Sequence, residues 1–526
     1  MSKKTLWLFL TLFLSLRIMA QGEDFIIRKG GCTPQISGET TGSHRAARRS
    51  LPTPNTKWDA SKVYKQMVIL FTFSDNEFVP ITDDKGEKVE PKAYYERLFN
   101  EEGYREYSGF GSVSDYFKEQ SDGRFNLKFD IYGPVKVSQK AQPYESPNED
   151  TRNYGEASIK EATQLVLETN PDVDYSQYDW NGDGEIEQVI YVYAGAAGNT
   201  MYTYGYVWPN TSTFAAITTH DGKKIIQYSA SAEYWYEADK GEPIFCGIGT
   251  VCHEFSHCLG LPDIYPVGSS DYPSSAVDEW DLMDGGNFTD WGWCPPNYSP
   301  LEKMLLGWLT PTELTEPASI TGMKTVDEGG AIYQIKHTDT EYLLLENRQW
   351  SGWNLCSPGE GLLIYYVNYN ESAWRSNRVN SFKSEDDFHY RIVHADNMIY
   401  ADWKAFLEAN KLSSYVEGHR VKRRHLSTSP YPTEENSELT DTSTPATKMS
   451  NGELLSKPIT KIQLSDGLIS FDFMGGATGI RNLRITDDEK SYLYNLQGQR
   501  VYTPLPGQIY IVKKKDGTVK KYMNTL

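Results

Sequence analysis

The stretch of residues 247–263 constrains this chain more than any other, because it reads H-E-x-x-H-x-x-G-x-x-D from its first histidine onward. Residues four apart lie on one face of a helix, so His253 and His257 can offer imidazole nitrogens to one metal ion. Gly260 tolerates the left-handed backbone that ends a helix sharply, and the turn would bring back Asp263 as a third ligand. Three protein ligands and a water are typical of catalytic zinc, so we expect a Zn²⁺ site here.

Glu254 lies between the two histidines, where it can reach a metal-bound water without being a ligand itself. The alternative is a solvated helix that carries the pentapeptide by chance. Apolar residues frame the motif and indicate that the helix packs against a core: Ile248, Val251, Cys252, Phe255 and Leu259. With Gly260 and Asp263 at the expected spacing, the metal site is the better interpretation.

A second motif, W-D-L-M-D-G-G, occupies residues 280–286, and its Met283 resembles the methionine of the tight turn beneath the metal in metzincin peptidases. Together with S-P-L-E-K-M-L-L-G-W-L at 299–309, these motifs resemble the immune inhibitor A-type family of secreted metallopeptidases. That family commonly has glycine where this chain has Ser256. The resemblance implies an α+β, metzincin-like zinc endopeptidase in which Glu254 acts as the general base on proteins or peptides.

Hydrophobic periodicity predicts an α/β subdomain before the metal helix, within a catalytic domain at residues 61–311. The expected strands are 65–73, 125–131 and 188–195, and the expected helices are 112–121 and 156–167. We expect strand 188–195 to line the cleft and to pair with extended substrate. A β-rich domain at 312–476 follows, with strands at 331–335, 341–348 and 361–367. The family resemblance extends over residues 65–475.

The first sixty residues predict export and processing. Lys3-Lys4, an apolar run at 6–16 and Ala20 are typical of a signal peptide at residues 1–20. Residues 21–60 are polar and rich in turn formers, so they are either a flexible extension or a prosegment released after the arginines at 45–49. In a prosegment, the Cys32 thiolate is a possible latch on the open zinc position.

The segment D-W-N-G-D-G-E-I-E at 179–187 resembles the first nine positions of a calcium loop. Possible Ca²⁺ ligands are Asp179, Asn181, Asp183, Glu185 and Glu187. The twelfth position is Ile190 and not the usual glutamate, so Glu187 would have to substitute for it. An ordinary acidic turn is the alternative.

Composition narrows the class of partner. A net charge of −19 argues against nucleic acid and anionic membranes as partners, and 526 residues suggest more than one domain. No later segment is long and apolar enough to span a bilayer, so we expect a secreted or cell-surface protein. The remaining cysteines, at 246, 252, 258, 294 and 356, leave disulfide pairing open.

Residues 477–526 resemble a C-terminal β-sandwich sorting domain of the type IX secretion kind, which implies contact with secretion machinery. A small ligand-binding β-module is the alternative. For the whole chain, two other functions compete with the endopeptidase: a non-catalytic surface binding protein on a metallopeptidase fold, and a zinc amidase acting on cell-wall peptide. Intact Glu254 argues against the first, because a binding module needs no general base.

Overall fold

The computed structural model describes residues 50–82, 86–141, 155–198, 207–236, 243–268, 273, 275–411, 424–476, 492–496, 498–501, 509–513 and 519–523. The predicted signal peptide, Cys32 and the arginine cluster at 45–49 lie outside these residues. Within the described residues, no helix is both long and apolar enough to cross a membrane.

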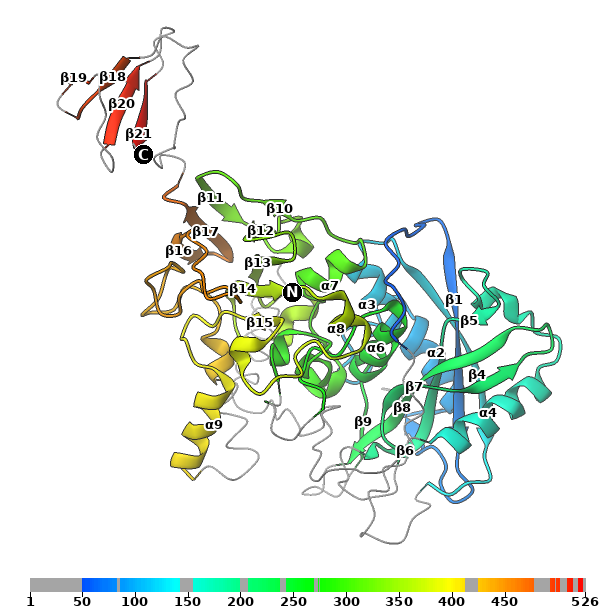
Figure 1. Cartoon of the computed structure of the whole chain (residues 1–526). Helices are drawn as coiled ribbons and strands as arrows, with labels where there is room; N and C mark the ends of the chain where they lie inside the picture. Colours follow the sequence, from blue (N-terminus) through cyan, green and yellow to red (C-terminus); the bar gives the residue numbers. More distant parts are fainter. Residues whose placement is uncertain are drawn as a thin grey trace, which may run out of the picture.

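A seven-stranded sheet dominates the first half of the chain, in the order β4-β1-β6-β8-β5, with β7 and β9 also paired to β8 (Figure 1). Strands along that order are parallel, whereas β7 and β9 are antiparallel to β8. The strands are β1 (Val63–Thr72), β4 (Asn126–Lys136), β5 (Glu185–Ile186), β6 (Val189–Ala196), β7 (Asn210–Thr218), β8 (Lys224–Tyr236) and β9 (Pro243–Phe245). The predicted mixed α/β architecture is confirmed.

The expectation that strand 188–195 pairs with substrate is wrong. This strand is β6, and it is hydrogen-bonded to β1 on one side and to β8 on the other. All of its residues are buried, so no edge of β6 is open to a peptide. Its continuous apolar run is typical of a central strand covered on both faces. In the described part of the sheet, β7 pairs only with β8 and is the strand nearest α6 with an outer edge.

Helices cover both faces of this sheet. In β1, Val68 and Leu70 point into one core with α2, α3 and α6, while Met67, Ile69 and Phe71 point into another that α4 covers. The α3 helix begins at a capping box, in which Ser112 and Asp115 satisfy each other's backbone N–H groups. The α-helices of this half are α2 (Pro91–Asn100), α3 (Val113–Gln120), α4 (Glu156–Thr169), α6 (Gly249–Ser256) and α7 (Pro300–Leu305).

The second half of the chain is β-rich, as predicted. One sheet has the order β10-β12-β13-β14-β15 and another the order β11-β17-β16. Their strands are β10 (Thr312–Glu313), β11 (Ala318–Met323), β12 (Tyr333–Lys336), β13 (Glu341–Arg348), β14 (Gly361–Asn368), β15 (Tyr390–Ile392), β16 (Ile459–Ser465) and β17 (Leu468–Phe473). The shorter elements are β2 (Ile81–Thr82), β3 (Lys88–Val89), α8 (Glu371–Arg375), α9 (Tyr400–Ala409) and the 3₁₀ helices η1 (Tyr175–Tyr178), η2 (His257–Leu259), η3 (Asp278–Trp280), η4 (Gly285–Gly292), η5 (Val326–Glu328), η6 (Gly352–Cys356) and η7 (Glu385–Asp387).

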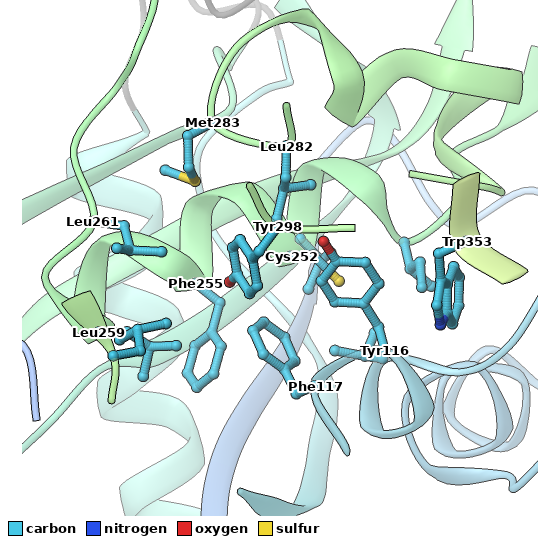
Figure 2. Close-up of a cluster of buried hydrophobic side chains, with 14 of the residues drawn as sticks. Tyr116, Phe117, Cys252, Phe255, Leu259, Leu261, Leu282, Met283, Tyr298 and Trp353 are labelled. Carbon is cyan, nitrogen blue, oxygen red and sulfur yellow. The ribbon is translucent and has the colours of Figure 1, made fainter. Parts of the chain in front are cut away.

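One hydrophobic core runs across the predicted boundary between residues 311 and 312. It joins Val68 and Phe255 of the first half to Leu344 and Tyr365 of the second. Figure 2 shows part of it, where the rings of Tyr116 and Phe117 pack with those of Phe255, Tyr298 and Trp353. Because the two halves bury their apolar surface against each other, we expect them to fold as one unit.

A buried arginine links the two halves. Arg348, at the end of β13, is fully buried. Its Nη2 atom donates to Glu346 Oε2 (2.8 Å) and to the hydroxyl of Tyr365 (3.2 Å). Its Nη1 atom donates to Asn354 Oδ1 (2.8 Å) and to the main-chain oxygen of Trp280 (3.3 Å). The last bond reaches the segment that leads into the predicted methionine turn.

The folded part of the chain begins before the predicted prosegment boundary at residue 60. Leu51 is buried, and its N–H donates to the main-chain oxygen of Arg375 (2.9 Å). Trp58 packs against Phe125 and Trp308, and its indole N–H donates to the main-chain oxygen of Leu306 (2.7 Å). Part of the segment predicted as a prosegment or flexible extension thus packs against the rest of the fold, and where a prosegment would end stays a prediction.

Near the C-terminus, the described residues form one four-stranded sheet in the order β19-β18-β20-β21. Its strands are β18 (Tyr492–Tyr494), β19 (Arg500–Val501), β20 (Ile509–Lys513) and β21 (Val519–Met523). The second sheet that a sandwich requires stays a prediction. All cysteines in the described ranges are free thiols, and those at 252, 258, 294 and 356 are buried.

Candidate active site

The metal-binding motif lies on α6 and on the turn that ends it. The helix gives way to the 3₁₀ turn η2, and Gly260 then takes the left-handed conformation, with φ +93°. The N–H groups of Gly260 and Leu261 bond back to the main-chain oxygens of His257 (3.1 Å) and Ser256 (3.2 Å). A side chain at residue 260 would place its Cβ 2.5 Å from the main-chain oxygen of Pro52, so only glycine fits this turn without strain.

Three donor atoms converge inside this turn. The Nε2 atoms of His253 and His257 lie 3.2 Å and 3.3 Å from the Oδ1 atom of Asp263. All three residues are buried and form one of the groups whose geometry can hold a metal ion. Two ligands bound at zinc's usual distance of about 2.0–2.1 Å in tetrahedral geometry are about 3.3 Å apart. The spacing therefore fits zinc.

Each histidine is oriented by a carbonyl oxygen behind it. The Nδ1 atom of His253 lies 2.8 Å from the oxygen of Leu282, and that of His257 lies 2.7 Å from the oxygen of Leu261. Because a carbonyl only accepts hydrogen bonds, Nδ1 carries the proton in both rings. When both rings are neutral, their Nε2 lone pairs therefore face the carboxylate of Asp263. Three electron-donating atoms arranged in this way can bind a cation.

Electrostatics at this centre favour a positive charge. Burial opposes protonation of His253, but the facing carboxylate of Asp263 outweighs it and raises the pKa of His253 to about 9. Burial also opposes ionisation of Asp263, yet the two imidazoles hold the pKa of its carboxyl well below the ordinary value. Without a metal the site retains a proton, so metal binding would release it.

Glu254 is held in place by a residue that the sequence did not identify. The hydroxyl of Thr211, at the start of β7, lies 2.7 Å from Glu254 Oε2 and 2.8 Å from the main-chain oxygen of Glu254. Both residues are buried. Thr211 lies 43 residues before Glu254, and no local motif marks it. Only the pairing of β7 with β8 beneath α6 brings the hydroxyl to the carboxylate.

Met283 lies in a buried turn that contacts the segments carrying the candidate ligands. Its main-chain oxygen accepts the N–H of Ile264 (2.9 Å), the residue after Asp263. The preceding carbonyl, of Leu282, is the one that orients His253. Figure 2 shows Met283 and Leu282 on the loop above α6. The turn therefore fixes a ligand and the segment that follows another ligand.

Ser256, which stands where the resemblance leads one to expect glycine, is fully buried. Its hydroxyl donates to the main-chain oxygen of Cys252 (2.6 Å) and bonds to the hydroxyl of Tyr298. The serine points away from the ligand side of α6 and links the helix to the segment that precedes α7.

A cavity of about 140 Å³ opens beside the second histidine. His257 lines it together with the start of β7, the segment Arg375–Asn377 and the segment Ser50–Pro52. The earliest described residues of the chain therefore lie beside His257, one of the candidate ligands. Leu51 is buried there, although sequence reasoning placed it in a flexible or removable segment.

The predicted calcium loop forms a compact acidic turn. The carboxylate of Asp179 accepts the N–H groups of residues 182–184 and the ammonium of Lys223 (2.8 Å). Glu187 accepts the N–H groups of Trp180 (2.8 Å) and Asn181 (3.1 Å), and burial raises its pKa to about 7. These carboxylates already have protein partners. The ammonium of Lys223 neutralises part of the negative charge that would attract calcium.

A second group with metal-like spacing lies in the β-rich half and comprises His394, Asp396 and His425. Hydrogen bonds account for its geometry. Asp396 Oδ2 lies 2.8 Å from His425 Nδ1 and accepts the Thr428 hydroxyl (2.8 Å), while Oδ1 accepts the N–H of Met398 (3.0 Å). Both oxygens of this carboxylate are thus engaged by hydrogen bonds within the β-rich half.

Comparison with known proteins shows a similarity to one peptidase family. Residues 55–304 match the immune inhibitor A peptidase M6 catalytic domain. The chain is similar to the pre-pro-metalloprotease PrtV of Vibrio cholerae, at 23% identity over 308 residues, which cover 52% of this chain and 32% of PrtV. It is similar to immune inhibitor A of Bacillus thuringiensis subsp. alesti, at 23% identity over 309 residues and 44% of that protein. The chain therefore spans less than half the length of these relatives.

Proposed function

Since residues 55–304 carry an immune inhibitor A peptidase M6 catalytic domain, we propose that this chain is a secreted, zinc-dependent endopeptidase that hydrolyses peptide bonds of proteins. The observation that carries the proposal is that His253 Nε2 and His257 Nε2 lie 3.2 Å and 3.3 Å from Asp263 Oδ1, beside a buried glutamate. A bound zinc would lower the pKa of a water and polarise the scissile carbonyl.

The role proposed for Glu254 is that of the general base. Its carboxylate would take a proton from the attacking water and later deliver it to the leaving amine. The Thr211 hydroxyl, 2.7 Å from Oε2, holds that carboxylate in one orientation. Because the orientation of this buried carboxylate is already fixed, its reorganisation during the reaction costs little free energy.

For the substrate, we propose an extended peptide that adds to the outer edge of β7. This edge begins at Thr211 and continues along Ser212 and Thr213, which line the cavity beside His257. Backbone pairing with a sheet edge recognises any extended peptide, which suits a protease. This proposal replaces the role predicted for the strand at 188–195.

Glu254→Gln tests the proposal most directly. The ligands survive this change, so the variant should bind zinc like the wild type while losing nearly all proteolysis. Glu302→Gln is a matched control, because Glu302 and Glu254 are each 2% exposed and Glu302 contacts none of the three proposed ligands. His253→Ala should lose both zinc and activity. Substantial proteolysis by Glu254→Gln would remove Glu254 from the role of base.

The two alternatives predict other outcomes of the same experiment. A non-catalytic binding protein would show no proteolysis in the wild type, with or without a chelator. A zinc amidase would release fragments from cell-wall peptide and leave an unstructured polypeptide such as casein intact. The family match favours the endopeptidase over both.

Export and latency are part of the proposal. We propose a signal peptide at residues 1–20, cleavage near Arg49 and a zinc latch at Cys32. The position of Ser50–Pro52 beside His257 supports it, because a chain continuing from Ser50 toward the N-terminus starts at the metal centre. Purified uncleaved Cys32→Ala precursor should be active before cleavage. If it is as silent as the wild-type precursor, the thiol is not the latch.

We also propose that residues 477–526 direct the protein to secretion machinery. Deleting residues 478–526 should leave the peptidase folded and active but reduce its level at the surface or in the medium. An unchanged extracellular level would leave this segment as a binding module.

Calcium binding at residues 179–187 is the last part of the proposal. Because the Lys223 ammonium bonds to Asp179, calcium would have to displace it. Lys223→Ala should therefore raise calcium affinity, measured by titration calorimetry. If neither Lys223→Ala nor the wild type binds calcium, the loop is an acidic turn only.

A further inference from the structure

Asn377 belongs to the β-rich half but its side chain reaches the metal centre. It follows α8, and its N–H bonds to the main-chain oxygen of Trp374 (3.1 Å). It is 4% exposed and has φ +56°, a left-handed conformation that asparagine adopts more readily than most residues. This backbone turns the side chain away from α8 and toward Asp263, a residue 114 positions earlier.

The amide of Asn377 makes two hydrogen bonds to Asp263. Its Oδ1 atom accepts the main-chain N–H of Asp263 (2.6 Å), and its Nδ2 atom donates to Asp263 Oδ2 (2.5 Å). The other oxygen, Oδ1, is the one that faces the imidazoles of His253 and His257. The amide thus binds one carboxylate oxygen and leaves the other aimed at the metal position.

We propose that Asn377 is a positioning residue, which holds Asp263 as a ligand through Oδ1 alone and so makes the β-rich half a part of the metal centre. The inference rests on the proposed zinc-dependent function. Partners that orient a ligand in this way are worth about 10- to 100-fold in metal affinity.

Two contacts that follow Asn377 in the sequence hold its segment against the chain just after Asp263. Asn380 Nδ2 donates to the main-chain oxygen of Ile264 (2.8 Å), and the hydroxyl of Ser381 donates to that of Val267 (2.6 Å). Residues 377–381 therefore run beside residues 263–267. The position of Asn377 is set by several bonds, so its amide is already in place before a metal binds.

Loss of the amide would act on Asp263 and not on the histidines. Asp263 is 1% exposed, so water cannot easily replace the donor at Oδ2. The carboxylate would then be free to rotate about its last bond, and both oxygens would compete for the metal position. We expect weaker zinc binding with the two imidazoles still in place.

The test is Asn377→Gly in the full-length chain, because glycine keeps the left-handed backbone while removing the amide. Asn380→Gly is the matched control: it removes an amide that bridges Ile264 and Tyr390 in the same segment but touches no ligand. Zinc dissociation constants would come from competition with a chelator, and urea midpoints of the zinc-free proteins would report stability.

The expected result is a zinc dissociation constant about 10- to 100-fold higher in Asn377→Gly and near the wild-type value in Asn380→Gly, although both lower the urea midpoint. Equal zinc dissociation constants in Asn377→Gly and the wild type would overturn the inference, and so would equal increases in both variants. A wild-type chain that binds no zinc would overturn the proposed function, and this inference with it.

Discussion

A buried pair of carboxyl groups lies directly under the methionine turn, and it makes the stability of this protein depend on pH. Asp281 is fully buried and Glu302 is 2% exposed. Asp281 Oδ1 accepts the N–H of Met283 (2.7 Å), and Glu302 Oε2 accepts the N–H of Ser299 (2.7 Å). The two carboxyl groups hydrogen-bond to each other, and the side chain of Ser299 hydrogen-bonds to both.

Such a pair holds one shared proton. Burial, together with the negative charge of Asp281, raises the pKa of Glu302 well above its ordinary value. In the unfolded chain both carboxyls ionise by about pH 5, so above that pH the folded state binds one more proton than the unfolded state. The pair's contribution to the free energy of unfolding is fully present below the unfolded pKa. It is lost as pH rises toward the folded pKa, by about 1.4 kcal/mol per pH unit.

Glu302→Gln removes this dependence. The new carbonyl oxygen can accept the N–H of Ser299, and the new amide can donate to Asp281 as the shared proton does. The free energy of unfolding, from urea titrations, should be similar in variant and wild type at pH 5. Above pH 5, the free energy of unfolding of the variant should exceed that of the wild type by about 1.4 kcal/mol more for each pH unit. The difference should reach about 4 kcal/mol at pH 8, provided that the pKa of Glu302 in the folded wild type lies above 8.

Titrations common to both proteins cancel in this difference, including those of the metal ligands. Asp281→Asn should flatten the pH dependence in the same way, because its amide can donate to Glu302. Parallel curves for the wild type and both variants between pH 5 and 8 would refute the shared proton.

Three other substitutions test the contacts around the site. Thr211→Val should lower kcat roughly 10- to 100-fold in a peptidase assay and leave zinc content unchanged. The reason is that a hydrogen bond to a carboxylate such as that of Glu254 is worth about 1.5–3 kcal/mol. An unchanged kcat would contradict the orienting role of Thr211. Arg348→Ala should lower the free energy of unfolding by about 3–5 kcal/mol in urea, since it leaves a buried carboxylate without its partner. Gly260→Ala should cost at least about 1–2 kcal/mol, because φ is +93° and the new Cβ would lie 2.5 Å from the Pro52 oxygen; a wild-type thermal midpoint would show that the turn relaxes.

Local patterns predicted the elements of the first half of the chain well. The apolar run at 65–73 overlaps β1 in all but its last residue, the segment 112–121 contains α3, and the segment 156–167 is the first part of α4. Patterns were less informative about placement. The run at 188–195 forms a strand as predicted, but its uniform burial makes it a central strand, and the edge near α6 belongs to β7. A strand that is buried on both faces has a continuous apolar run, and this run does not reveal the position of the strand in the sheet.

The sequence by itself determined which side chains form the candidate metal site. His253 and His257 are one helical turn apart, Gly260 supplies the left-handed turn, and Asp263 follows within reach. These relations span few residues, so backbone geometry alone enforces them. Helix and turn stereochemistry is the same in any protein, and a short motif is therefore sufficient to predict such a group of residues.

Only the tertiary structure decided what holds those side chains in place. Thr211 and Asn377 lie 43 and 114 residues from the groups they contact, on opposite sides of α6 in the sequence. Neither position has a periodic or motif signal, because a contact across the fold depends on how sheets and helices pack and not on chain spacing. The shared core from Val68 to Tyr365 has the same origin. It forms because each half leaves apolar side chains that the other half covers.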